Sequence, residues 1–295
     1  MIKNKNNSNI LWCKFFITPF LISLISVGIP SCSKKITASC PVPITIYSQD
    51  EKDIARKNLD KKGIPFSSQS LTDAIESNDA ATVLDMIKLG INLEKNDEGS
   101  SHTPLTASIL GNKSEIIDLL VKNGASVNTK DGNGHIPFIL GISSVDSKVA
   151  KELINNCANV NIYDGSNNEY RNALLIAIDE QKIELVQLLI QKGANVNKAG
   201  GFGLMPLNRA STFNSLGIVK VLVENGANIK YVSKNGWTPL MNAIDDKQYE
   251  IAKYLIEHGV MLNTRDKKGN SAVSLAKVQG RQDILDLLAS KGVSN

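Results

Sequence analysis

The sequence is poor in the side chains that perform chemistry. It has four cysteines and three histidines in 295 residues, and its aromatic content is only 5%. The metalloprotease pattern HExxH, the nucleophile pattern GxSxG, the phosphate-binding pattern GxxxxGK[ST] and paired CxxC motifs are all absent. We therefore expect a protein that is not an enzyme, with no catalytic residues, no cofactor and no metal site.

Acidic residues are missing before Asp50. Lys3, Lys5 and Lys14 precede an apolar run over residues 15–29, which is shorter than the ~20 residues that span a bilayer as a helix. Basic, apolar and small residues in this order are typical of a secretory signal. The pattern predicts a signal over residues 1–31, with a retained signal anchor as the alternative.

The end of this segment, Gly28-Ile29-Pro30-Ser31-Cys32, resembles a bacterial lipobox, although the proline is unusual there. The resemblance implies lipidation of Cys32, followed by a flexible tether over residues 32–49. Ser33 stands where an aspartate would retain a lipoprotein at the inner membrane, so the implied location is the periplasmic side of the outer membrane. The alternatives are ordinary cleavage nearby and a free Cys32.

The charge is nearly balanced once the signal is removed. The full chain has 33 basic and 29 acidic residues, and three lysines leave with the signal, which gives 30 against 29. Nucleic-acid binding draws on dense Lys and Arg along the phosphates. We therefore expect no nucleic-acid partner.

What the sequence does contain is a repeat. Two markers recur together, and their steps are 33, 36, 33, 33 and 33 residues. The first marker is Gly124-Ala125, Cys157-Ala158, Gly193-Ala194, Gly226-Ala227, Gly259-Val260 and Gly292-Val293. The second is Thr103-Pro104-Leu105, Ile136-Pro137-Phe138, Asn172-Ala173-Leu174, Met205-Pro206-Leu207, Thr238-Pro239-Leu240 and Ser271-Ala272-Val273. A period of this size predicts stacked supersecondary units, with the longer step placing an insertion near residues 164–170.

One unit, residues 236–263, illustrates the local structure that the repeat predicts. Thr238 is a natural helix N-cap, and Pro239 suits the first helical position because its fixed φ fits and its missing N–H is not needed there. Two short apolar stripes follow, and Gly259 provides the left-handed residue that ends the second helix. The unit is therefore predicted to be helix, turn, helix and hairpin-like loop.

These markers resemble the ankyrin-repeat family, whose signature combines a Thr-Pro-Leu helix start with a Gly-Ala-x-x-Asn helix end. The resemblance implies an all-α solenoid of about seven helix-turn-helix units over residues 67–295, preceded by a capping helix over residues 50–66. The expected repeats lie near residues 69–98, 99–131, 132–164, 165–200, 201–233, 234–266 and 267–295.

Repeat three departs most from the pattern. Cys157 stands where the family has glycine, so either a residue with a Cβ adopts a left-handed conformation there or the turn rearranges, at a cost of about 1 kcal/mol. Gly141 and Ser143-Ser144 lie in its first helix. We expect this unit to be the weakest inner repeat. A bond between Cys40 and Cys157 requires the tether to fold back, and the favoured alternative is a partly buried Cys157 with Cys40 free.

The family binds partners with its loops and the inner face of its first helices, and this places the expected partner-binding residues by alignment of the repeats. They are Tyr163, Glu169, Arg171, Phe202, Phe213, Trp237, Asp245, Asp246 and Arg265. Large aromatics and Arg often dominate interface energies. Each aromatic is equally well explained by packing between repeats.

Two further groups of residues suggest weaker sites. His102 and His135 occupy equivalent places in adjacent repeats, and a helix packing distance of 8–10 Å is expected to keep them too far apart to share a metal. Asp179-Glu180 and Asp245-Asp246 lie in equivalent turns. They are expected to be solvated, with an acidic strip on the concave side as the alternative.

The ankyrin resemblance implies a protein–protein interaction module, which we expect to be monomeric, and the signal and lipobox-like segment add the expectation that it is exported and lipid-anchored. One concrete version is an immunity protein that neutralises a toxin. The alternative is a stabiliser or scaffold for a periplasmic enzyme, such as catalase, or for an envelope protein. An enzyme is the least favoured reading.

Overall fold

The computed structural model describes residues 45–95, 101–163 and 171–293. In these residues a single helix, α1, is followed by seven helix pairs, which confirms the predicted all-α repeat solenoid. The helices are α1 Gln49–Lys62, α2 Ser68–Glu76, α3 Ala80–Lys88, α4 Pro104–Leu110, α5 Ser114–Lys122, α6 Pro137–Ser143, α7 Ser147–Asn155, α8 Ala173–Asp179, α9 Ile183–Gln191, α10 Pro206–Ala210, α11 Leu216–Glu224, α12 Pro239–Asp245, α13 Tyr249–Glu257, α14 Ala272–Val278 and α15 Gln282–Ser290, with a 3-10 turn η1 at Gly201–Gly203. None of the described helices is long and apolar enough to cross a membrane.

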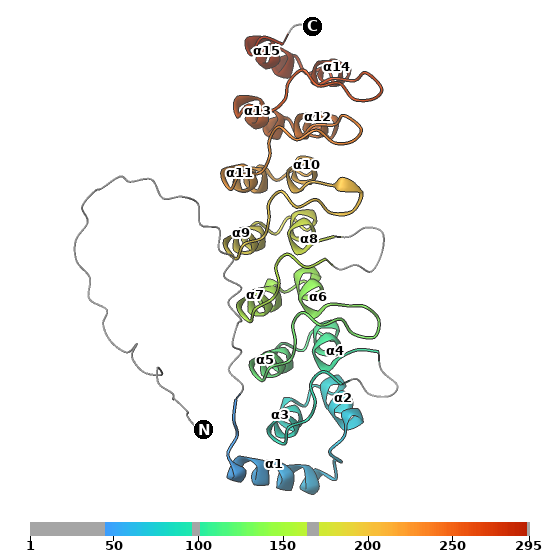
Figure 1. The fold of residues 1–295 in the computed structure, drawn as a ribbon, viewed down its shortest axis with the longest axis vertical. Helices are drawn as coiled ribbons and strands as arrows, with labels where there is room; N and C mark the ends of the chain where they lie inside the picture. The colour runs from blue at the N-terminus through green and yellow to red at the C-terminus, as the bar shows by residue number, and fades with distance from the viewer. Residues whose placement is uncertain (1–44, 96–100, 164–170, 294–295) are drawn as a thin grey trace, which may run out of the picture. The chain divides into compact units, whose positions relative to one another are not determined.

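The pairs stack in chain order, so that each repeat contacts its neighbours (Figure 1). First helices such as α4 and α6 pack on one another, and second helices such as α5 and α7 do the same. We call the hairpin-like loop that leads into each first helix the finger of that repeat. The described fingers project on the side of the first helices (Figure 1). This layout places finger residues and first-helix residues on one continuous surface.

The helix starts follow the chemistry that the sequence predicts. The Thr238 side chain accepts a hydrogen bond from the Met241 N–H at 3.2 Å, and Pro239 occupies the first turn of α12. Asn172 replaces Thr at the start of α8 and accepts from the Leu175 N–H at 2.9 Å. A side-chain oxygen at this position satisfies an N–H that the helix itself leaves unpaired.

Packing produces one hydrophobic cluster that runs from Leu59 of α1 to Val293 near the C-terminus. Gly141 of α6 is explained by this packing, because a Cβ there would lie 2.5 Å from Leu153 Cδ1. The glycine lets α7 approach α6 closely. Gly141 therefore favours this close approach, although the contacting atom is the end of a side chain that could shift, and it is also a residue of low helix propensity.

Helix α1 covers the first repeat. Its buried residues are Ala55 and Leu59, and α1 packs against α3. Lys62 Nζ lies 2.9 Å from Asp79 Oδ2 and donates to Thr82 Oγ1 at 2.7 Å. The apolar end of the array is thus shielded from water, as a terminal repeat requires.

A ladder of asparagines links successive repeats. Asn128 Nδ2 donates to the Cys157 carbonyl at 3.1 Å, and its Oδ1 accepts from the Asn159 N–H at 2.8 Å. Asn161 and Asn197 repeat the pattern, donating at 2.9 Å to the carbonyls of Gly193 and Gly226. Each amide therefore joins the end of one repeat to the end of the next.

Cys157 adopts the left-handed conformation that the repeat pattern predicts, with φ 68°. It is also disulfide-bonded. The expectation of an unpaired Cys157 is therefore wrong. The other cysteines, Cys13, Cys32 and Cys40, lie outside the described residues.

Candidate interaction surface

A groove opens between the fingers of repeats five and six. We call it the Phe202 groove, and it has a volume of about 280 Å³. The lining residues that matter for its chemistry are Phe202, Leu204, Asn208, Tyr231, Trp237 and Asn242. The groove thus combines three aromatic side chains with three side-chain amides, since Asn235 also lines it.

Phe202 is the most unusual residue of this groove. Its side chain is 88% exposed, and its backbone is left-handed with φ 56° and ψ 15°. A left-handed non-glycine residue costs about 1 kcal/mol or more. The finger is held in place where the Tyr231 hydroxyl donates to the Gly203 carbonyl at 3.2 Å. A strained backbone thus presents a large aromatic ring to solvent, which gives no stability to the isolated chain.

Asn208 adds an unpaired acceptor to the same groove. The residue is 4% exposed, and its Oδ1 is the one buried side-chain atom without a hydrogen-bond partner among residues 45–95, 101–163 and 171–293. Such a group costs about 1–3 kcal/mol and calls for an explanation. Because this oxygen has almost no accessible surface, a donor from a ligand would satisfy it once the Asn208 side chain turns toward the groove.

An ion-pair network lies beside the groove and is formed by α8, α10 and Arg171 of the finger that leads into α8. Arg209 Nε lies 2.6 Å from Asp179 Oδ1, and Arg171 lies 3.5 Å from Asp179 Oδ2. The Arg209 guanidinium also stacks 4.7 Å from the centre of the Phe213 ring. Two predicted residues, Arg171 and Phe213, are thus brought together through Asp179 and Arg209.

The same network corrects the expectation for the acidic turns. Asp179 is ion-paired, and its side chain is only 15% exposed. Glu180 pairs with Lys182 Nζ at 2.5 Å. In repeat four, therefore, Asp179 is held within the protein, whereas Glu180 remains exposed beside Lys182.

Asp245 and Asp246 differ from the acids of repeat four, because both are exposed at the end of α12. Partial burial, and next the neighbouring charge of Asp245, raise the pKa of Asp246. The turn of Asp245 and Asp246 therefore offers negative charge to a partner on the repeat-six side of the Phe202 groove.

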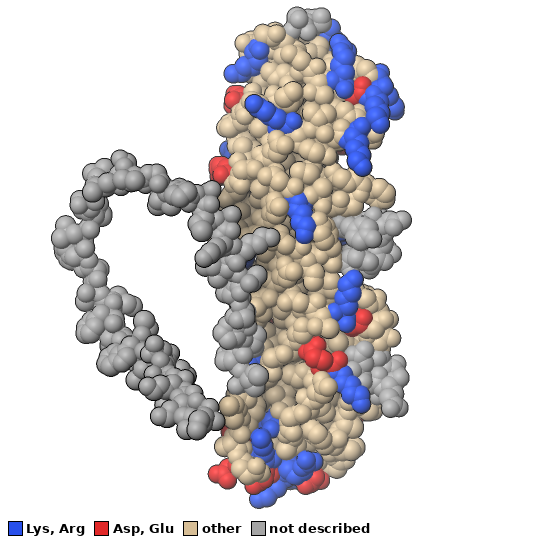
Figure 2. All heavy atoms as spheres, in the orientation of Figure 1, with Lys and Arg blue, Asp and Glu red and all other residues tan. Residues whose placement is uncertain are grey.

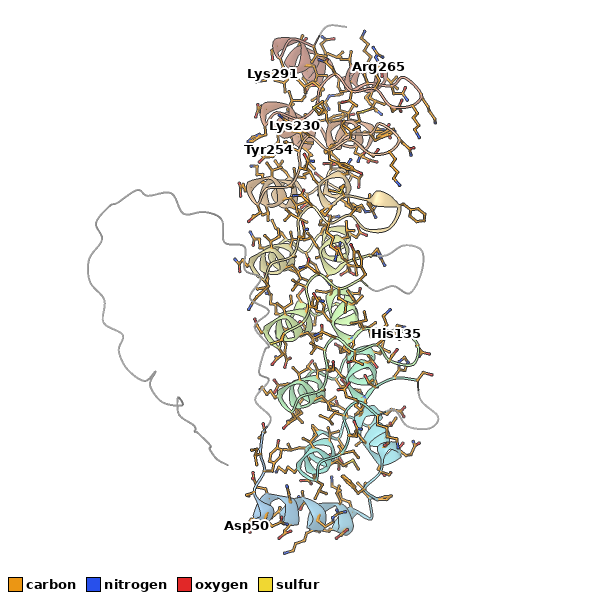
Figure 3. The ribbon with its side chains drawn as sticks, in the orientation of Figure 1. Asp50, His135, Lys230, Tyr254, Arg265 and Lys291 are labelled. Carbon is orange, nitrogen blue, oxygen red and sulfur yellow. The ribbon has the colours of Figure 1, made fainter. Side chains whose placement is uncertain are left out.

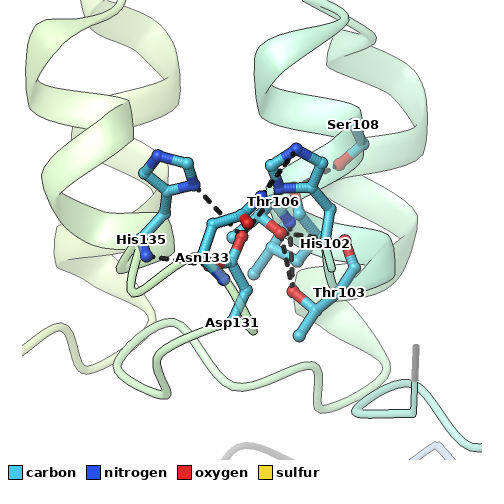
Figure 4. A network of polar contacts seen from close by, with 8 residues as sticks. His102, Thr103, Thr106, Ser108, Asp131, Asn133 and His135 are labelled. Atoms are coloured by element: carbon cyan, nitrogen blue, oxygen red, sulfur yellow. Dashed lines mark hydrogen bonds and ion pairs between the residues drawn. The ribbon is translucent and has the colours of Figure 1, made fainter. Parts of the chain in front are cut away.

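A second polar cluster lies between the fingers of repeats two and three (Figure 4). Asp131 Oδ2 lies 2.8 Å from His102 Nδ1 and 3.3 Å from His135 Nδ1. The imidazole rings are stacked with their centres 5.5 Å apart. The expectation that adjacent fingers keep the two histidines too far apart is wrong, because the side chains lean together over a shared carboxylate.

Burial raises the pKa of Asp131. Hydrogen bonds from His102 and from the His135 backbone lower the pKa, and together the lowering effects are larger. The net pKa is below its ordinary value, which keeps the carboxylate charged beneath the two rings. The 33-residue spacing of the two histidines was the sequence signal for this cluster. The spacing did not reveal that Asp131 joins them.

Comparison with known protein families decides the classification. The model for ankyrin repeats (3 copies) matches residues 71–164, 142–233 and 207–295, and these matches together cover more than half of the chain. The chain belongs to the ankyrin-repeat family. No curated protein matches the sequence significantly.

In this ankyrin array, some predicted partner-binding residues are engaged within the protein itself. The Tyr163 hydroxyl donates to the Ala199 carbonyl at 3.2 Å, and Lys198 Nζ lies 4.1 Å from the centre of the Tyr163 ring. Tyr163 therefore holds two ankyrin fingers together. Trp237 is half-buried and lines the Phe202 groove, so part of its side chain packs within the protein and part is accessible to a partner.

The remaining predicted sites are more scattered. Arg265 donates to the Gly269 carbonyl at 2.9 Å and lies on the finger side of the array, as His135 does (Figure 3). Arg265 is exposed, but it lies in the finger of repeat seven and is not among the residues that line the Phe202 groove. Glu169 and the lipidation candidate Cys32 lie outside the described residues.

Charges of both signs are distributed over the visible face of the ankyrin domain (Figure 2). Basic side chains gather at the fingers of the C-terminal repeats, while much of the middle of this face is uncharged (Figure 2). The sequence missed Arg209 and Asn208 as members of the surface, because their importance depends on contacts between repeats.

Proposed function

We propose that this chain binds another protein through the Phe202 groove and the neighbouring Arg209–Asp179 network. Ankyrin repeats are general protein–protein interaction modules. The observation that carries the proposal is Phe202, a fully presented ring on a strained backbone beside the unpaired Asn208 oxygen. A partner side chain that fills the groove would cover the exposed Phe202 ring, and a donor from the partner would remove the cost of the unpaired Asn208 oxygen.

The partner should combine an apolar or aromatic anchor with nearby charge. Trp237 and Leu204 offer an apolar wall, while Arg171 and the Asp245 turn offer both signs at the edge. Interfaces of this kind have an apolar core surrounded by a polar rim. The chain acts in this proposal as a monomer, without nucleic acid.

We further propose that the protein is exported and lipid-anchored at Cys32, on the periplasmic side of the outer membrane. The support is the lipobox-like sequence, together with the disulfide at Cys157, because disulfides persist in oxidising compartments. In that place the module would serve as an immunity protein that occludes a toxin. The alternative role is a stabiliser or scaffold for a periplasmic enzyme or an envelope protein.

The binding proposal is tested by affinity capture from the native cell envelope with quantitative mass spectrometry. Wild type is compared with the double variant Phe202→Ala and Arg171→Ala. The matched control is Val278→Ala, which removes a side chain that is 84% exposed on α14, outside the groove. A partner enriched by wild type and by the control, and lost from the double variant, is expected. Equal recovery with all three proteins would refute the proposal.

Once that partner has been captured, its activity distinguishes the immunity role from the stabiliser role. An immunity protein should abolish the activity of the captured protein, whereas a stabiliser should prolong it during incubation. Metabolic labelling with a clickable fatty acid tests the anchor, with Cys32→Ser as the control. Absence of label on the wild-type protein would refute lipidation.

A further inference from the structure

The cluster of His102, Asp131 and His135 has the composition and geometry of a metal centre. One ligand atom from each residue lies within 4.8 Å of the other two. The Asp131 side chain is fully buried, whereas those of His102 and His135 are 31% and 38% exposed. The carboxylate thus forms the floor of a shallow site whose two walls are imidazoles and whose mouth opens to water.

The carboxylate of Asp131 is held in a fixed orientation. Its Oδ1 accepts from the backbone N–H groups of Asn133 at 3.0 Å and His135 at 2.8 Å. This leaves Oδ2 facing the two Nδ1 atoms. Asn133 Nδ2 lies 3.4 Å from His102 Nε2, the ring nitrogen on the far side from the carboxylate. Such an outer contact orients a ligating imidazole.

The C-terminal finger provides an internal comparison. Asp266 occupies the same repeat position as Asp131, and its Oδ1 accepts from the N–H groups of Lys268 and Asn270, both at 2.8 Å. Its Oδ2 accepts from the Asn270 amide at 2.9 Å. Trp237 and Asn270 stand there in the places of the two histidines. A finger therefore folds around the aspartate with an asparagine in place of the second histidine, so the histidine pair is not needed for the finger fold.

We infer that His102, Asp131 and His135 bind one divalent transition-metal ion, with Zn²⁺ as the best fit. Imidazole nitrogen and carboxylate oxygen are ordinary zinc ligands at about 2.0–2.2 Å, which places tetrahedral ligand atoms about 3.3–3.6 Å apart. The two Nδ1–Oδ2 distances of 2.8 and 3.3 Å are close to that spacing. Small rotations of the half-exposed rings complete the geometry.

The ion would join two fingers that otherwise meet through hydrogen bonds. Gly132 N–H donates to the Ser101 carbonyl at 2.7 Å directly beside the cluster. Three protein ligands leave a fourth position, which faces the solvent side of the rings and accepts water or a side chain of a partner. Metal binding would thus stiffen repeats two and three against each other.

The test is calorimetric titration of Zn²⁺ into the full chain, without an affinity tag, after removal of bound metal with a chelator. One tightly bound equivalent and a rise in the thermal midpoint with added Zn²⁺ are expected. His102→Gln and His135→Gln should each weaken binding at least ten-fold. The control is His258→Gln. His258 lies in repeat six, away from the cluster, where its Nδ1 is hydrogen-bonded to the Tyr254 carbonyl oxygen at 2.7 Å.

Substitution of Co²⁺ for Zn²⁺ gives a second readout, because ligand-field absorption in the visible range reports a site with nitrogen and oxygen ligands. That absorption should vanish in the double variant His102→Gln and His135→Gln while circular dichroism shows retained helix. The inference is overturned if wild type and the double variant bind Zn²⁺ equally, or if His258→Gln alone removes binding.

Discussion

Replacing Gly236 by alanine should loosen the contact between the fingers of repeats six and seven. Gly236 has φ +87°, and a Cβ built there would lie 2.6 Å from Asp266 Cα and 2.7 Å from the Arg265 carbonyl oxygen. Both neighbours are backbone atoms, so the overlap cannot be relieved by rotating a side chain. The finger of repeat seven must move instead.

Gly269 provides the matched control, since it occupies the same position one repeat later. Its φ is +84°, but a Cβ there would meet nothing within 4 Å. Alanine in a left-handed conformation costs about 1–2 kcal/mol at either site. Overpacking against the backbone adds about 1–3 kcal/mol at Gly236 alone. The free energy of unfolding should therefore fall by about 1–3 kcal/mol more for Gly236→Ala than for Gly269→Ala.

The assay is urea unfolding, followed by circular dichroism for the whole array and by Trp237 fluorescence for the local region. Trp12→Phe in every protein leaves Trp237 as the single tryptophan. Because repeat arrays need not unfold in one step, the two midpoints are compared as well as their free energies. Equal losses in both glycine variants would refute the steric argument, because the two sites differ chiefly in their neighbours.

Three further predictions concern stability. Burial and the Asp118 carboxylate raise the pKa of Glu152 to about 7, so the folded state loses stability as pH rises from about 4.5 to about 7. In thermal melts Glu152→Gln should raise the midpoint at pH 8 and leave it unchanged at pH 4; equal shifts at both pH values would contradict this. Reductant should lower the midpoint of wild type but not of Cys157→Gly, since a disulfide contributes about 2–4 kcal/mol; identical sensitivity would disprove it. Thr238→Ala should lower the free energy of urea unfolding by about 1 kcal/mol through loss of the cap on Met241 N–H, whereas Thr238→Ser should retain most of it.

The repeat markers were sufficient to predict the fold because each marker acts locally. Thr238 caps its own helix, and Cys157 takes the left-handed position that the spacing assigns to it. Such features depend on a few adjacent residues, and the sequence contains them directly. The expectation of a weak third repeat stays a prediction, although Gly141 now has a packing role against Leu153.

The surface was less predictable because it depends on contacts between repeats. Asp179 and Arg209 are 30 residues apart, and only stacking brings their side chains to 2.6 Å. The separation expected for His102 and His135 was that of helix axes, whereas the finger side chains converge on Asp131. Phe202 was expected at the surface, but its neighbour Asn208 gave no sequence signal, because burial without a partner is a property of the folded chain.

The asparagine ladder has a consequence for the order in which the repeats can finish folding. Each amide reaches forward by about thirty residues, as Asn161 does to the Gly193 carbonyl and the Asn195 N–H. During synthesis from the N-terminus, a repeat therefore emerges before the group that will satisfy its asparagine. The repeats that end in Asn128, Asn161 and Asn197 therefore complete their hydrogen bonds only when the next repeat has been made, and a chain that stops just after one of them leaves that amide without its partner.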